Sequence, residues 1–343
     1  MGTAIRTACL LTAVALTAAA CGDDGGSEDA ASGSGSEEVR DLTIGRIASS
    51  PYTPVDYGVA SGFFEERGIN VEVVDIPSAG PQVTAVESGS IDMFLNTPVV
   101  AASANQAGSE LRLFCGSSTQ TVSFLMAEGA GEPATEDTWE ETVRSWEGQV
   151  IGVPALGGNA EFIVRDLAEQ AGLAPDDLEL VAVGPPTGAA IQQLQSGDIG
   201  VLYSFPYFTE SLRDSTTVAL NLATVGPESL VNQIGSTWVA SQEWLDDNAE
   251  LATEFCGYYG ELISEVQDPA NAEAVNAVLE DVNGIPADTV DDVREAALEE
   301  GGGLRILTTD ITCEQIHDAV ILTVESGQLP EEPACDTLLW SEA

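Results

Sequence analysis

The stretch VESGSIDMFLNTP at residues 86–98 returns 108 residues later as LQSGDIGVLYSFP at residues 194–206. Each copy begins with the end of an expected helix and stops at a Ser-Gly pair. A short apolar run follows and ends before a proline, which is typical of a buried strand and the loop after it. Each copy therefore predicts a helix, a short strand and a loop, in that order.

The similarity continues upstream of both copies. The run LTIGR at 42–46 parallels QVIGV at 149–153, at an offset of 107 residues. A predicted helix follows each run, and a second strand follows that helix, at 71–76 and at 178–183. Two successive β-α-β-α-β units of similar length predict an α/β fold of two lobes, each built on a mostly parallel sheet.

Apolar residues at helical spacing predict the helices around these strands. They indicate helices at 54–67, 161–170 and 313–326, and a helix-rich stretch over 241–300. His317, the single histidine of the chain, falls on the apolar face of the last helix. We therefore expect it to be a core residue rather than a ligand or a base.

The charge of the chain is strongly one-sided. Its 343 residues contain 57 Asp and Glu against ten arginines and no lysine, which gives a net charge of −47. The missing lysine excludes Schiff-base chemistry and a Gly-Lys-Ser/Thr phosphate loop, and a single histidine excludes a multi-histidine metal site. So negative a surface repels nucleic acid, and we expect no nucleic-acid partner, metal or cofactor. It suits either a halophilic source or an ordinary acidic secreted protein.

The first forty residues predict an export signal and a tether. Residues 1–20 combine the positive charge of Arg6, a short apolar middle and small residues at the end, as in a secretory signal peptide. The segment LTAAAC at 16–21 resembles a bacterial lipobox, which implies that Cys21 becomes a diacylated N-terminus. The alternative is ordinary signal-peptidase cleavage beside an incidental cysteine. Residues 21–40 are mainly small or acidic and predict a flexible linker to the extracytoplasmic face of the cell membrane.

Four further cysteines predict two disulfides. An even number outside the cytoplasm favours a disulfide framework, and four cysteines allow three pairings. Cys313 and Cys335 are 22 residues apart near the C-terminus, and we expect their disulfide to clip the tail onto the last helix. That pairing leaves Cys115 with Cys256. No motif around any of these cysteines indicates a catalytic thiol.

Residues 41–265 resemble the bacterial solute-binding proteins for nitrate, taurine, alkanesulfonates and thiamine-pyrimidine precursors. The matching features, in order, are YTP at 52–54, GFF at 62–64, GINVEV at 68–73, SGSID at 88–92, SWEGQVIGVP at 145–154, GLAPDD at 172–177 and GDI at 197–199. The family's Leu-Lys-Gly-Lys segment is resembled by the stretch 145–154 here, in which both lysines are missing. The resemblance implies a type II periplasmic-binding-protein fold, in which two lobes joined by two hinge strands close on a ligand.

The resemblance also divides the chain. It implies a first part of lobe 1 at 41–122, lobe 2 at 123–238, and a return to lobe 1 with C-terminal helices at 239–343. The hinge strands are expected near 121–125 and 236–240. Ligands of such sheets bind at the carboxyl ends of the strands, where helix N-termini present free N–H groups.

That rule and the hinge together select the candidate ligand-binding residues. They are Ser49, Ser50, Tyr52, Asn96, Thr97, Gln120, Thr121, Gly157, Gly158, Asn159, Thr187, Phe205 and Trp238. The rings of Tyr52, Phe205 and Tyr207 are candidates for stacking on a flat ligand, and Arg46 is the one cation considered for an anionic ligand.

The resemblance implies a monomeric lipoprotein that delivers a small organic solute to an ABC permease and its ATPase. Few cations near the expected site disfavour inorganic anions, so a sulfonate or taurine-like solute and a pyrimidine or other vitamin precursor stay open. A sensing or interaction lipoprotein of the same fold without transport is the alternative. The related pyrimidine-forming enzymes need a lysine-bound pyridoxal phosphate and a cysteine cluster, which this chain lacks, so we expect no enzyme activity.

Overall fold

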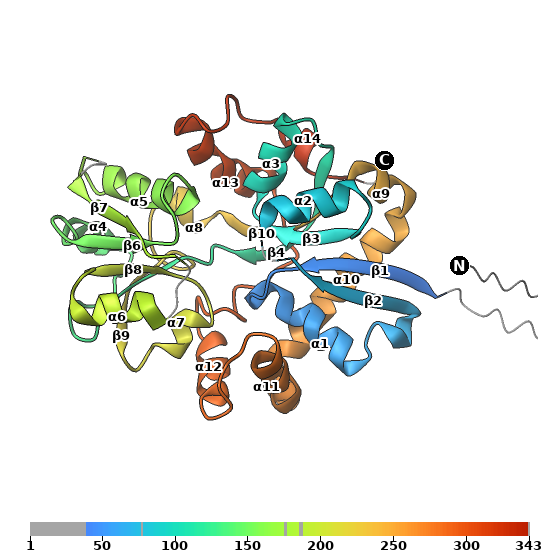
Figure 1. Cartoon of the computed structure of the whole chain (residues 1–343), viewed down its shortest axis with the longest axis horizontal. Coiled ribbons are helices and arrows are strands. Elements are labelled where there is room, and N and C mark those ends of the chain that lie inside the picture. Colours follow the sequence, from blue (N-terminus) through green and yellow to red (C-terminus); the bar gives the residue numbers. More distant parts are fainter. Residues whose placement is uncertain (1–38, 77, 175–176, 185–187, 342–343) are drawn as a thin grey trace, which may run out of the picture. The chain divides into compact units, whose positions relative to one another are not determined.

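Two five-stranded sheets organise the described residues of the computed structural model, which are 39–76, 78–174, 177–184 and 188–341 (Figure 1). The first sheet has the order β2-β1-β3-β10-β4, and the second has the order β7-β6-β8-β5-β9. Both sheets lie in the compact unit Val39–Ala343. The strands of the first sheet are β1 (Arg40–Arg46), β2 (Ile69–Asp75), β3 (Met93–Asn96), β4 (Leu111–Thr119) and β10 (Ile234–Ser241). Those of the second are β5 (Ser123–Ala127), β6 (Val150–Val153), β7 (Glu179–Ala182), β8 (Val201–Ser204) and β9 (Thr216–Asn221).

The two sheets repeat one topology. In the first, β1 is parallel to β2 and β3, whereas β10 is antiparallel to β3 and β4. In the second, β6 is parallel to β7 and β8, whereas β5 is antiparallel to β8 and β9. Four strands of each sheet therefore run in one direction and one strand is reversed. This arrangement confirms the two-lobed α/β fold that the sequence repeat predicts.

We call the first sheet with its helices lobe 1 and the second sheet with its helices lobe 2. The chain passes from lobe 1 to lobe 2 through residues 120–122, between β4 and β5, and returns through residues 222–233, between β9 and β10. All of β10 pairs within the first sheet, so the second crossing lies before the hinge strand expected near 236–240, and the return is complete a few residues before the boundary expected at 239.

Helices cover both sheets, as Figure 1 shows. In the first half of the chain they are α1 (Thr53–Ser61), α2 (Ala79–Glu87), α3 (Pro98–Gln106), α4 (Trp139–Arg144), α5 (Asn159–Gln170) and α6 (Gly188–Ser196). In the second half they are α7 (Phe208–Ser211), α8 (Glu228–Val231), α9 (Gln242–Asp247), α10 (Ala249–Gln267), α11 (Ala272–Asp281), α12 (Val290–Ala297), α13 (Cys313–Glu325) and α14 (Cys335–Leu338). The helix predicted to reach residue 67 is shorter, because Gly62 ends α1 in the left-handed conformation at φ 78°.

Each lobe has its own hydrophobic core, against which its helices pack. Trp238, Phe255 and Tyr259 centre the core of lobe 1, where α1 and α10 pack beside the sheet. Phe124 and Trp146 are buried in the core of lobe 2. The structure contains the disulfides Cys115–Cys256, between β4 and α10, and Cys313–Cys335, between α13 and α14. They join the cysteines that the sequence analysis pairs.

Helix α13 lies between the lobes at the top of Figure 1. It packs against α3 and β10 of lobe 1 and against α5 of lobe 2. The expectation for His317 on this helix is wrong, because its side chain is 47% exposed and its Nδ1 lies 2.6 Å from Glu332 Oε1. His317 lies within an apolar helical pattern, but its side chain points to the surface and pairs there with Glu332.

The described residues contain neither a membrane-spanning helix nor a cluster of metal ligands. No helix there is long and apolar enough to cross a membrane. No group of His, Cys, Asp or Glu there has the arrangement of a metal site.

Candidate ligand-binding site

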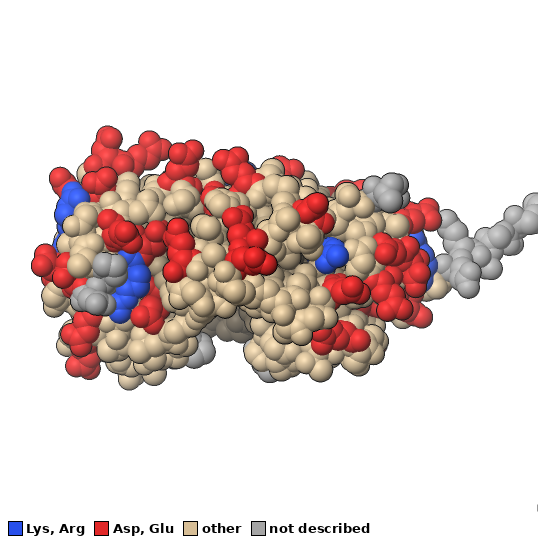
Figure 2. Space-filling view, turned by 90° about the horizontal axis from the view of Figure 1, so that it is seen from above, with Lys and Arg blue, Asp and Glu red and all other residues tan. Residues whose placement is uncertain are grey.

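The loops at the carboxyl ends of β1 and β8 meet, although they belong to different lobes. Thr53, just after the loop that follows β1, shares a hydrogen bond of 2.7 Å with the hydroxyl of Tyr207, which follows β8. Both side chains are buried. Figure 2 shows a hollow between the lobes whose edges are formed mainly by uncharged residues, while acidic residues gather elsewhere on that view. The strand-end loops are therefore brought together where a ligand of this fold class is expected.

Four predicted residues of lobe 1 lie on these loops. Ser49 precedes the short 3-10 helix η1 (Ser50–Tyr52), and the Ser50 hydroxyl is buried without a hydrogen-bond partner among the described residues. Asn96 ends β3, donates a 3.1 Å hydrogen bond to Gln82 Oε1 and accepts one of 2.9 Å from the Thr97 backbone N–H. Thr97 precedes α3 in extended conformation, and its side chain does not cap the helix. This edge therefore presents hydroxyl and amide groups without charge.

The glycine loop before α5 is partly occupied by the chain itself. Gly157 has φ 75°, and its N–H donates to Glu161 Oε2 at 2.8 Å. Its carbonyl accepts a hydrogen bond from Gln328 Nε2. Gly158 precedes the helix in extended conformation, and Asn159 opens it as an exposed residue. A carboxylate of the chain thus already accepts a backbone N–H at this helix start, where a ligand is expected.

Two of the aromatic candidates belong to the core of lobe 1 instead of the site. The Tyr52 hydroxyl donates to Gly45 O at 2.6 Å and accepts from Leu95 N at 2.7 Å, so it ties β1 to β3. Burial raises the pKa of Tyr52 well above its ordinary value. Trp238 is fully buried and meets Phe255 edge-on, with ring centroids 4.8 Å apart. Neither ring is free to stack on a ligand.

Phe205 is the aromatic candidate that stays accessible. It is 37% exposed after the end of β8 and contacts Tyr203 edge-on at 5.2 Å. Thr187 and Cys21 lie outside the described residues. Phe205 is therefore the described aromatic residue best placed for contact with a solute.

The predicted hinge residues brace the two crossings. Gln120 is buried, accepts from Thr121 N at 2.9 Å and donates to Gln233 Oε1 at 3.0 Å. Gln233 in turn donates to the carbonyl of Asp318 on α13 at 2.8 Å. Gln120 thus links the outgoing crossing to the returning one. Both ends of its amide are hydrogen-bonded to the chain itself.

Two neighbouring carboxylates neutralise the positive charge of Arg46. Its guanidinium donates to Asp56 at 2.6 Å and to Asp75 at 2.7 Å. Burial raises the pKa of Asp56 to about 6, although the charge of Arg46 acts in the opposite direction. Two carboxylates on one cation leave no surplus positive charge for an anionic ligand.

Sequence reasoning missed a buried contact between the lobes. Tyr207 has φ 67°, the one positive φ outside glycine among the described residues, and its ring lies in the core of lobe 1. Its N–H and that of Gly303, at 2.9 Å, both donate to the buried carboxylate of Glu210. A Cβ on Gly303 would lie 2.6 Å from Pro206 Cβ and 3.2 Å from Ser50 Cβ. We call Thr53, Tyr207, Glu210 and Gly303 the lobe contact; the Gly-Gly-Gly run at 301–303 was its one visible signal.

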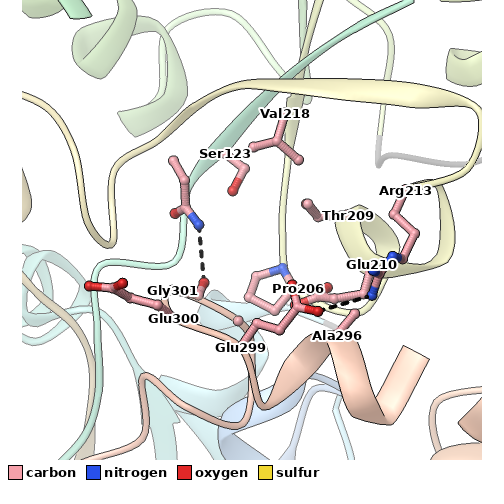
Figure 3. Close-up of a pocket in the computed structure, with 12 residues that line it drawn as sticks. Ser123, Pro206, Thr209, Glu210, Arg213, Val218, Ala296, Glu299, Glu300 and Gly301 are labelled. Atoms are coloured by element: carbon pink, nitrogen blue, oxygen red, sulfur yellow. Dashed lines mark hydrogen bonds and ion pairs between the residues drawn. The ribbon is translucent and has the colours of Figure 1, made fainter. Parts of the chain in front are cut away.

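A pocket of about 220 Å³ opens beside the lobe contact (Figure 3). Lobe 2 contributes β5, β9 and the residues around α7, and the other wall is the end of α12 with the turn after it. Burial raises the pKa of Glu210 in this wall above its ordinary value. We call this cavity the seam pocket.

Known proteins share this fold. A family model described as the NMT1-like family matches residues 35–279. The periplasmic aliphatic sulphonate binding protein from Escherichia coli superposes with a TM-score of 0.71 at 17% identity, over 89% of this chain and 93% of that one. The alkanesulfonate-binding protein from Xanthomonas axonopodis pv. citri gives 0.62 at 16% identity, over 86% and 96%.

The periplasmic nitrate-binding protein from Synechocystis gives a TM-score of 0.59 at 15% identity, over 88% of this chain and 84% of that one. No curated protein matches the sequence. At these identities the likeness to solved structures shows a common fold.

Proposed function

The chain belongs to the NMT1-like family, and on that premise we propose that it is the extracytoplasmic solute-binding component of an ABC importer. The observation that carries the proposal is the pair of like lobes whose strand-end loops meet at the lobe contact. Structural neighbours with this fold are named as sulphonate-binding and nitrate-binding proteins, which supports binding over catalysis. The solute would be held between the lobes, and the receptor would pass it to a permease driven by an ATPase.

The solute that we propose is a small organic molecule, either sulfonate or taurine-like or a pyrimidine or other vitamin precursor. Arg46 is compensated by two carboxylates, and Glu161 occupies the start of α5. These charges disfavour a small inorganic anion, whose binding depends on charge alone, more than a sulfonate or taurine-like solute that also has an apolar part. Accessible Phe205 supports a solute with an apolar or flat part. We further propose a monomer held to the membrane through Cys21.

Thermal melting against a solute panel tests this function. Residues 39–343 would be melted in molar salt with sulfonates, nitrate, pyrimidines, flavins and aromatic acids. A solute at a hundred times its Kd stabilises the folded state by about 2.7 kcal/mol, a readable shift in Tm. A saturable hit supports the receptor and identifies the solute class. A flat panel from a cooperatively melting protein would count against capture of these solutes and favour a role without transport.

Gly158→Asp locates the solute at the loop before α5. The added side chain meets open space, so we expect an unchanged Tm in molar salt together with loss of binding to the solute found above. Gly257→Asp, on an exposed and equally open position of α10, is the matched control and should bind normally. Unaltered affinity in Gly158→Asp would remove this loop from the site.

A further inference from the structure

We propose that the seam pocket binds a small molecule bearing a primary ammonium group. None of the residues that line this pocket is among the candidate ligand-binding residues of the strand-end loops. The site therefore goes beyond the solute-binding function proposed above, and either can fail without the other. Three features of the pocket carry the inference: its charge, one free buried hydroxyl and the absence of rings from its lining.

The lining of the pocket is negative. Glu210, Glu299 and Glu300 contribute three carboxylates, and Arg213 contributes the one cation of the lining. Arg213 already pairs with Glu299 at 3.4 Å, with both side chains largely exposed. Figure 3 shows this pair at one side of the pocket, and Glu300 at the other. An anion would have to compete with Glu299 for Arg213, whereas a cation meets Glu300, whose carboxylate has no ion pair within the described residues.

A buried hydroxyl points to a ligand independently of the charge. Ser123 on β5 is 4% exposed, and its hydroxyl makes no hydrogen bond within the described residues. Figure 3 shows that hydroxyl directed into the pocket. A hydroxyl that has no protein partner and faces a cavity is an open position for a donor or an acceptor. An ammonium N–H supplies the donor.

The chemistry of the lining selects the kind of cation. Quaternary ammonium groups are recognised by aromatic faces, and no aromatic residue lines this pocket. Carboxylate, hydroxyl and carbonyl oxygens instead suit the three N–H donors of a primary ammonium group. The described residues show no arrangement for a metal ion. The ligand is therefore an organic amine of a size that about 220 Å³ accommodates.

Occupancy of the pocket favours the closed arrangement of the lobes. Asn221 of β9 donates to the carbonyl of Gly301 at 3.2 Å across the pocket, and Glu210 accepts from Gly303. Because one wall belongs to lobe 2 and the other packs with the core of lobe 1, a ligand that touches both walls binds best when they are together.

Calorimetric titration with three matched small molecules tests the site. Ethanolamine carries the primary ammonium, choline carries a quaternary one on the same two-carbon frame, and ethylene glycol has no charge. We expect ethanolamine to bind in the millimolar range, as a four-atom ligand should, choline at least tenfold more weakly and ethylene glycol not at all. Methanesulfonate is the anionic control and should not bind.

Variants then place the binding in the seam pocket. Ser123→Ala should weaken ethanolamine about tenfold, because it removes an acceptor. Glu300→Gln should weaken it several-fold, because it removes a negative charge while keeping an oxygen at the same place. Glu243→Gln removes an exposed carboxylate from α9, away from the pocket, and should leave the Kd unchanged. Each variant is melted first, so that loss of folding is not read as loss of binding.

Several results would overturn the proposal. Equal Kd values for ethanolamine and choline would show simple attraction of cations to an acidic surface. An unchanged Kd in Ser123→Ala would place the amine elsewhere, and a titration that never saturates would show that no amine site exists. Binding of methanesulfonate in place of ethanolamine would reverse the charge assignment.

Discussion

Gly303 is a residue at which the two lobes meet without room for a side chain. A methyl group there would overlap the Cβ atom of Pro206 and would be in tight contact with the Cβ atom of Ser50, and neither atom can rotate away. The φ of Gly303 is not positive, so the backbone itself admits alanine. We expect Gly303→Ala to force the lobes apart and to lower the free energy of unfolding by about 1–3 kcal/mol.

Small-angle scattering and denaturant unfolding together check the Gly303→Ala prediction. The scattering should show a larger radius of gyration than for the parent protein. Gly257→Ala, at an open position in the middle of α10, is the control and should be stabilising by about 0.5–1 kcal/mol. A Gly303→Ala protein with parental dimensions and stability would mean that the lobe contact accommodates the methyl group without loss of unfolding free energy.

Asp56 is a second residue with a measurable signature. Burial raises its pKa from 3.8 to about 6, so the folded chain holds this proton to a higher pH than the unfolded chain does. Between about pH 4 and pH 6 the folded state binds more protons, and stability falls as the pH rises. The two-unit shift corresponds to about 3 kcal/mol over that interval.

Asp56→Asn isolates this contribution from the other acids. The difference in unfolding free energy between the parent and the variant should change by about 3 kcal/mol from pH 4 to pH 6.5, in favour of the variant at the higher pH. Denaturant titrations at several pH values measure it. Two curves that stay parallel would show that Arg46 compensates Asp56 fully.

At the scale of elements, local patterns predict the fold well. The repeat at 86–98 and 194–206 gives β3 and β8 with the helices before them, because strand and helix periodicity depend on neighbours in sequence. Local patterns predict the candidate site less well than the fold. The pairing of Thr53 with Tyr207 spans 154 residues, and no local pattern encodes it. Trp238 and Tyr52 were placed at the ligand because they adjoin a hinge and a loop, yet tertiary packing buries both.

The two disulfides stabilise elements to different extents. Cys115–Cys256 closes a loop of 141 residues and joins β4 to α10, whereas Cys313–Cys335 closes one of 22 residues between α13 and α14. Loop-closure entropy gives about 5 kcal/mol for the first and about 3 kcal/mol for the second. Double alanine variants, compared by denaturant unfolding under oxidising conditions, should reproduce that order. Equal losses would mean that residual structure in the unfolded chain cancels the difference in loop length.

At the scale of the whole molecule, the lobes share one design but are joined asymmetrically. Each sheet has the same strand order, yet the C-terminal segment crosses the boundary on two sides, through the turn at Gly303 and through α13. Any solute that draws the lobes together either strengthens or strains these contacts. The lobe contact therefore sets part of the affinity without touching the solute.

The folded unit Val39–Ala343 carries most of the chain's net charge of −47, which predicts a strong dependence on salt. Acidic side chains spread over the surface seen in Figure 2, and like charges repel more in the folded state than in the expanded chain. The screening length falls from about 10 Å at 0.1 M to about 3 Å at 1 M salt. We expect Tm to rise by at least about 5 °C between 0.05 and 1 M NaCl, since each 1 kcal/mol of relieved repulsion is worth about 2 °C in a chain of this size.

Lowering the pH separates screening from other effects of salt. Near pH 4 many carboxylates are protonated, so the same salt step should raise Tm much less. Arg144→Gln removes one exposed ion pair with Glu140 and should leave the salt dependence intact, because the effect belongs to the total charge. A salt dependence that is equal at pH 4 and pH 7.5 would assign it to the salting-out of apolar surface, and the acidity would then contribute little to the stability of this fold.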